Sequence, residues 1–275
     1  MIAAAGCMTA MHTVVRYLSA DIHPFELVFF RSLFGLLALS PLFFQYGVNS
    51  FRTSQPRLQA LRGLTGICAT LAWFFGLSVV SLAEATALSF TNAIFGSVIA
   101  AVFLREHFSG RRVAAVLVGL IGVLIILRPG LSDWNSGTLI VLFSAMCWGA
   151  SIVIIKQLSR TDTSVSIVAW FGIQLTLFSL PFAVLVWTWP STVDYVWLGL
   201  MGILGTLGHL AMVRALRLMD AAAAFPLDFT RLIWAGLFGF IFFFEFPDLW
   251  TWIGAAIIIT STIIFLRREF DINHQ

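Results

Sequence analysis

Charged side chains are scarce in this chain. Asp, Glu, Lys and Arg together make up 11% of the 275 residues, whereas soluble domains carry roughly 25%. Apolar residues make up 60%, and a soluble domain of this length could not cover them with so little polar surface. They come in runs of about 18–25 residues, the length that crosses a bilayer as a helix. The composition therefore predicts an all-α polytopic membrane protein.

Sequence signatures of catalysis and metal binding are also lacking. There is no HExxH or DxxD motif, and a P-loop is excluded because Lys156 is the only lysine. Cys7, Cys68 and Cys147 lie inside apolar runs without a CxxC or Cys/His cluster, which favours small core residues over a disulfide or metal site. Basic residues are scattered, so no nucleic-acid partner is indicated. We expect neither an enzyme nor a bound cofactor or metal.

Ten transmembrane helices are predicted, separated by short loops rich in turn-forming and polar residues. No loop exceeds about a dozen residues, which leaves no room for a soluble catalytic domain. The short alternating segments of a membrane β-barrel are not seen. The predicted spans are residues 1–18, 24–46, 57–79, 82–104, 110–128, 137–158, 164–189, 192–217, 221–245 and 248–267.

An internal repeat is the clearest pattern in the chain. Residues 62–128 recur without a gap at residues 201–267. A weaker match joins Cys7, Arg16, Leu18 and Pro41 to Cys147, Lys156, Leu158 and Pro181. We therefore predict two five-helix repeats, residues 1–130 and 137–268, followed by a cytoplasmic tail at 269–275. Duplication in a hydrophobic chain is typical of transporters whose site lies between the halves.

The basic residues predict the orientation of the spans. Loops two, four, six and eight and the C-terminus hold nearly all of them, so both termini are expected to be cytoplasmic. Because each repeat has an odd number of spans, the second repeat would enter the membrane from the opposite side and be inverted. The basic residues counted for these loops are Arg52, Arg57, Arg62, Arg105, Arg111, Arg112, Lys156, Arg160, Arg214 and Arg217.

Polar residues within the spans are the candidate binding groups, because a charge in hydrocarbon needs a reason to be there. His209, Asp228 and Arg231 lie about 10–15 Å along their predicted helices. Asp228 and Arg231 could neutralise each other at i, i+3, or Arg231 could bind an acceptor on a substrate. The positions equivalent to these three in the first repeat are Thr70, Ser89 and Asn92. An inverted axis would bring both sets to one central layer.

Aromatic residues form a second candidate lining. Trp73, Trp148 and Trp170, with Gln174, could stack on a planar or amphipathic solute, although packing is the alternative for each. Arg31 could pair with Glu26 or face the cavity. Glu106 and Glu245 are repeat equivalents at opposite membrane faces, where they could act as gates or as surface caps.

Several segments resemble one transporter family. They are LAEATALSFTNAIFGSVIAAVFLRE at 82–106, AAAAFPLDFTRLIWAGLFGFIFFFE at 221–245, GLIGVLIILRPG at 119–130 and CWGASIVIIK at 147–156. Their order and duplication resemble the EamA branch of the drug/metabolite transporter superfamily, and HPFELVFFR at 23–31 resembles the S-adenosylmethionine carrier subgroup. The resemblance implies a basket of helices in which spans one to four and six to nine surround a central cavity.

The function expected from these patterns is secondary transport of a small organic metabolite, amino-acid-like or cofactor-like, by alternating access. Uptake or exchange of S-adenosylmethionine, riboflavin or another nucleoside-like cofactor is the alternative. A channel or an intramembrane enzyme would be a different class of protein. The expected partners are the solute, membrane lipids and a coupling proton, and the expected location is a bacterial inner membrane.

Overall fold

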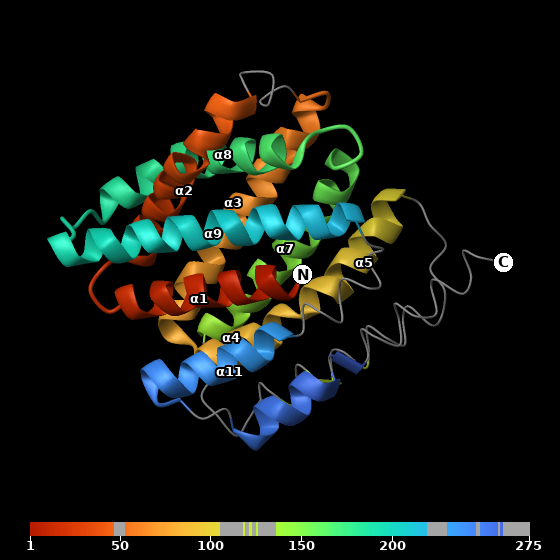
Figure 1. The fold of residues 1–275 in the computed structure, drawn as a ribbon. Coiled ribbons are helices and arrows are strands. Elements are labelled where there is room, and N and C mark those ends of the chain that lie inside the picture. The colour runs from red at the N-terminus through yellow and green to blue at the C-terminus, as the bar shows by residue number, and fades with distance from the viewer. Residues whose placement is uncertain are drawn as a thin grey trace.

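The computed structural model describes residues 1–46, 53–104, 118, 121–122, 125, 136–218, 230–245, 248–257 and 259–260. This part of the chain is helical and contains no strand (Figure 1). Five of its helices contain stretches that are long and apolar enough to cross a membrane: Pro24–Pro41, Pro56–Val79, Ser136–Leu158, Ser164–Leu185 and Thr192–Ala215. The predicted all-α polytopic membrane architecture is therefore confirmed.

The helix boundaries follow the predicted spans closely. In the first half the helices are α1 (Ile2–Leu18), α2 (Pro24–Tyr46), α3 (Pro56–Val79), α4 (Leu82–Ser89) and α5 (Thr91–Leu104). In the second half they are α7 (Ser136–Leu158), α8 (Ser164–Leu185), α9 (Thr192–Leu218) and α11 (Thr230–Phe243). Residues 249–257 are also helical. Most of the predicted span 110–128 and the end of span 248–267 lie outside the described residues.

The predicted span at 82–104 is not one continuous helix. It is divided at Phe90 into α4 and α5. Hydroxyl groups on both sides of the break donate hydrogen bonds to backbone carbonyls three residues earlier: Ser89 to Thr86 and Thr91 to Leu88, each at 2.7 Å. Such bonds compete with the helical ladder and bend helices, and here they accompany a break that contains no proline.

The helices pack in pairs that bring the two halves together. α3 lies along α7, α1 lies along α9, and α2 packs against both α8 and α9. Figure 1 shows α9 (cyan) running between α1 and α2 (both red to orange), with α4 and α11 meeting below α1. Each half therefore buries its apolar faces mainly against the other half.

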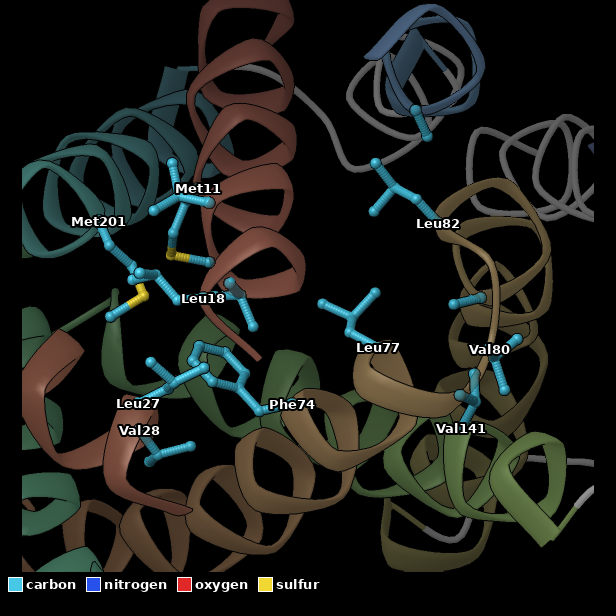
Figure 2. Close-up of a cluster of buried hydrophobic side chains, with 14 of the residues drawn as sticks. Met11, Leu18, Leu27, Val28, Phe74, Leu77, Val80, Leu82, Val141 and Met201 are labelled. Carbon is cyan, nitrogen blue, oxygen red and sulfur yellow. The ribbon is translucent and has the colours of Figure 1, made fainter. Parts of the chain in front are cut away.

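An apolar cluster fills the bundle where α1 and α3 end and α2 and α4 begin. Figure 2 shows Met11 and Leu18 of α1 facing Leu27, Phe74 and Met201. Leu77 and Leu82 extend the cluster toward the α3–α4 junction, and both are fully buried. This end of the bundle is thus closed by side-chain packing.

Backbone contact between α5 and α7 generates a prediction about stability. A Cβ atom at Gly149 would lie 2.5 Å from the carbonyl oxygen of Asn92 and 2.7 Å from the nitrogen of Gly96. These are backbone atoms that cannot move aside singly. We expect Gly149→Ala to lower the free energy of unfolding by about 1–3 kcal/mol, as overpacking does.

The matched control is Gly199→Ala, because a Cβ atom at Gly199 would meet nothing within 4 Å. Thermal unfolding of both variants in the same detergent gives the comparison. Equal melting temperatures for the two variants would show that α5 and α7 do not approach as closely as described.

Candidate functional site

A central cavity lies between the two halves and opens partly to solvent. It collects side chains from eight helices, so no single helix forms it. The lining residues are Met8, Met11, His12, Arg31, Ala69, Thr70, Trp73, Phe74, Ser89, Asn92, Ser144, Ala145, Trp148, His209 and Arg231.

The polar positions that the repeat relates to one another meet in this cavity. Thr70 of α3, Ser89 of α4 and Asn92 of α5 line it from the first half. His209 of α9 and Arg231 of α11 line it from the second. Asp228, the remaining member of the predicted layer, lies outside the described residues. Five side chains chosen by repeat equivalence therefore share one cavity, although they are up to 161 positions apart in the chain.

The hydroxyl groups of the lining are held by the backbone. Thr70 donates to the carbonyl of Gly66, Ser89 to that of Thr86 and Ser144 to that of Ala69, each at 2.7 Å. Since a hydroxyl has one proton to donate, these oxygens face a solute only as acceptors.

Of the predicted aromatic group, only Trp73 and Trp148 line the cavity. Trp73 packs against His12 with ring centroids 5.2 Å apart, and Trp148 packs edge-on against His209 at 5.6 Å. Trp170 and Gln174 lie on α8 outside the lining, and the Gln174 amide packs over Gly63 of α3. The predicted four-residue stacking group is therefore not assembled here.

Positive charge dominates the polar groups of the cavity. Arg31 lines it and is 7% exposed, and Arg231 lines it with its guanidinium 5.4 Å from the centre of the Phe90 ring. No aspartate or glutamate lines it among the residues described. Arg31 does not pair with Glu26, one of the two predicted arrangements; that carboxylate accepts hydrogen bonds from the backbone and hydroxyl of Thr188, both at 3.1 Å. Arg31 instead faces the cavity.

Two groups of this region were missed or misplaced from sequence. His12 lies mid-way along α1 and lines the cavity; its position inside the first span was the signal that could have identified it. Arg62 was counted as a loop residue, but it lies inside α3 and is only 1% exposed. Its guanidinium lies 4.0 Å from the centre of the Phe171 ring. The loop assignment of Arg62 is therefore wrong.

Glu245 lies at the closed end of the bundle, in an ion pair with Arg16 of α1. Arg16 also donates to the carbonyls of Leu77 and Val80 at the end of α3, and Glu245 accepts from the backbone nitrogen of Leu82 at 3.3 Å. This pair joins the ends of α1, α3, α4 and α11. Glu106, the equivalent of Glu245, lies outside the described residues.

Comparison with known proteins places this architecture in a family. The profile of the EamA-like transporter family matches residues 1–128 and 135–267. The chain belongs to the EamA-like transporter family. The protein is accordingly a membrane transporter and not an enzyme, which agrees with the expectation from its composition and motifs.

Named relatives cover most of this EamA-like chain. The S-adenosylmethionine uptake transporter of Rickettsia bellii is 30% identical over 261 residues, which span 95% of this chain and 90% of that protein. The riboflavin transporter of Vibrio cholerae is 29% identical over 239 residues, 86% of this chain and 80% of that one. A crystal structure with 18% sequence identity shares the fold, with a TM-score of 0.64 over 96% of this chain and 98% of the other.

The cavity predicts which introduced thiols will react in water. In a cysteine-free background, Ala145→Cys would place a thiol in the cavity, where water allows it to ionise and react. Phe178→Cys would place one on the outer face of α8, where Phe178 is 60% exposed, in hydrocarbon. We expect a charged methanethiosulfonate reagent to label position 145 at least about tenfold faster than position 178. Equal rates would contradict the assignment of the cavity as the aqueous compartment.

Proposed function

We propose that this protein is a secondary transporter that binds a nucleoside-like or amino-acid-like metabolite in the central cavity and moves it by alternating access. A solute of the S-adenosylmethionine type is the first candidate, because relatives named for its uptake align over nearly the whole chain. The observation that carries the proposal is the lining: repeat-equivalent polar residues from both halves, beside aromatic walls, in one central cavity.

The chemistry of the lining supports a flat, polar solute. Trp73, Phe74 and Trp148 offer ring faces and edges on which a base can stack. The indole nitrogen of Trp73 is buried and has no hydrogen-bond partner among the described residues. Arginine and hydroxyl groups supply further donors and acceptors. A riboflavin-type solute would use the same walls.

The helix pairs support the two inverted repeats that we propose for residues 1–130 and 137–268. The repeat relates α1, α2, α3 and α5 to α7, α8, α9 and α11. Exchanging each helix for its equivalent turns the pair α3–α7 into α9–α1, and both pairs are observed. The pair α2–α9 likewise becomes α8–α3, and α5–α7 becomes α11–α1, each again observed. A pseudo-two-fold axis between α2 and α8 accounts for this pattern. Ten spans, cytoplasmic termini with a tail at 269–275, and a bacterial inner-membrane location complete the proposal.

The ion pair of Arg16 and Glu245 is proposed as the lock of the closed end. It joins four helix ends above the apolar cluster of Figure 2, so it must break before the cavity opens on that side. The repeat gives Lys156 and Glu106 as the equivalents of Arg16 and Glu245. Lys156 is exposed in this structure. We propose that these two residues form the matching lock when the opposite end closes.

Removal of the Arg231 guanidinium tests the binding role of the cavity. We expect Arg231→Ala to reduce uptake of labelled S-adenosylmethionine into proteoliposomes about tenfold or more, because a hydrogen bond to a charged group contributes about 1.5–3 kcal/mol. The exposed Arg160→Ala, in the loop between α7 and α8, is the matched control. Wild-type uptake by Arg231→Ala at equal expression would remove that residue from the site.

Neutralising the lock should open the closed end more often. We expect Glu245→Gln to raise the rate at which an impermeant thiol reagent labels Ala145→Cys from that side by about tenfold, the effect of roughly 1.4 kcal/mol on the opening equilibrium. Asp194→Asn, which removes a capping carboxylate at the start of α9, is the control. A lower melting temperature with an unchanged labelling rate would make Glu245 a static cap instead of a gate.

A further inference from the structure

We propose that Arg31 and Arg62, arranged about the Phe171 ring, form a subsite for an anionic group of the solute, a carboxylate or a phosphate. The inference rests on the proposed function and extends it, because it names the part of the solute that is recognised. Arg31 lines the central cavity, Phe171 lines the smaller cavity beside it, and Arg62 lies behind the Phe171 ring and lines neither, so Arg31 would contact the anionic group and Arg62 would add to the positive potential there.

Arg31 has the properties of an anion-binding group. Its guanidinium lies 5.8 Å from the centre of the Phe171 ring, and the side chain donates no hydrogen bond and forms no ion pair within the described part of the chain. It lines both the central cavity and a smaller neighbouring cavity between α2, α8 and α9, as His209 also does. A buried guanidinium with its donors unused costs free energy unless an anion joins it.

Arg62 approaches the same ring from α3. Its guanidinium lies 4.0 Å from the centre of the Phe171 ring and 5.4 Å from that of Trp148. Its hydrogen bond to the hydroxyl of Ser151 is long at 3.5 Å, and its Nε atom is buried with no partner among the described residues. Ring contacts attract a cation but leave its charge in place, and no carboxylate among the described residues forms an ion pair with either arginine.

Two glycines make room for these side chains. A Cβ atom at Gly66 would collide with the Arg62 guanidinium and with the Phe171 ring. A Cβ atom at Gly205 would lie 3.0 Å from Nε of Arg31 and 2.7 Å from the sulfur of Met11. Gly66 and Gly205 are equivalent positions of the repeat, as are Arg31 and Phe171 at the spacing that relates Arg16 to Lys156. These glycines therefore hold the charged groups in place as well as allowing helix contact.

The geometry leads to a rule for solute selection. A guanidinium binds carboxylate or phosphate through two parallel hydrogen bonds, and in this wall the competing water is limited by Phe171 and Trp148. A solute with an anionic group near its ring system should therefore bind more tightly than the same solute without it. The cationic centre of a molecule such as S-adenosylmethionine would have to lie away from this wall.

Matched solute pairs test the rule on the purified full-length protein in detergent. S-adenosylmethionine is compared with its decarboxylated form, which lacks only the carboxylate, and flavin mononucleotide with riboflavin, which lacks the phosphate. Wild-type protein should bind the member that carries the carboxylate or phosphate about tenfold to a hundredfold more tightly in at least one pair. Arg31→Gln should abolish that preference. The pair that responds identifies the anion as carboxylate or phosphate.

A second variant that displaces Arg31 and a control variant complete the test. Gly205→Ala retains both arginines but displaces the Arg31 side chain, whose flexible end can move without unfolding the bundle, and should reduce the preference in the same direction. Arg160→Gln, an exposed arginine in a loop, should change nothing. A preference that survives Arg31→Gln, or an equal loss of affinity for both members of a pair, would overturn the subsite.

Failure of the proposed function has a different signature. If none of the four solutes binds, the nucleoside-like substrate class is wrong, and acetate and inorganic phosphate at constant ionic strength then test the subsite alone. Either anion should raise the melting temperature of the wild-type protein, since a ligand of the folded state stabilises it, and should not raise that of Arg31→Gln. No effect of either anion on the wild-type protein would overturn the subsite independently of the substrate.

Discussion

The cost of holding a positive charge inside an apolar helix bundle is the constraint on which this structure depends. Removing an arginine from water costs several kcal/mol, and only an anion with good geometry repays it. Arg31, Arg62 and Arg231 are all at most 8% exposed, in a chain whose composition is otherwise that of a bilayer-spanning protein. Glycines at 66 and 205, aromatic faces at Phe171, Trp148 and Phe90, and a helix break beside Ser89 all serve to seat these groups. The cavity is the place where the cost of burying Arg31 can be recovered by a ligand.

The two-fold relationship that we propose between the halves would explain why the polar groups meet. Helices that pair across the halves do so twice, with the repeats exchanged. Under the proposed inverted topology, the two equivalent contacts of each such helix pair would have to alternate between tight and open as the cavity changes sides. The charges do not obey the symmetry: Arg31 is matched by Phe171, and Arg231 by Asn92. A symmetric scaffold thus carries an asymmetric lining, which allows the mechanism of opening to be shared by a family while the lining selects the solute.

Much of the fold could be predicted from the sequence, since apolar runs of fixed length and breaks at turn residues determine where membrane helices lie. Helix ends such as Leu18, Pro24 and Val79 followed from that pattern. The interruption at Phe90 did not, because residues 82–104 read as one apolar run without proline. Repeat equivalence selected Thr70, Ser89, Asn92, His209 and Arg231 for the cavity, since a shared depth is a property of topology. It could not distinguish Trp148 from Trp170, nor show that Arg62 turns inward, because side-chain direction within a helix depends on tertiary packing.

The central claim is that one cavity carries the solute across and opens to one side at a time. Counterflow in proteoliposomes tests this most directly. Vesicles loaded with unlabelled S-adenosylmethionine are diluted into a trace of the labelled compound, with flavin mononucleotide and riboflavin run in parallel. The account predicts a transient accumulation of label inside, above its external concentration, for at least one of these solutes, and saturation as the external concentration rises. Entry that only equilibrates and increases linearly with concentration would contradict alternating access and indicate a channel.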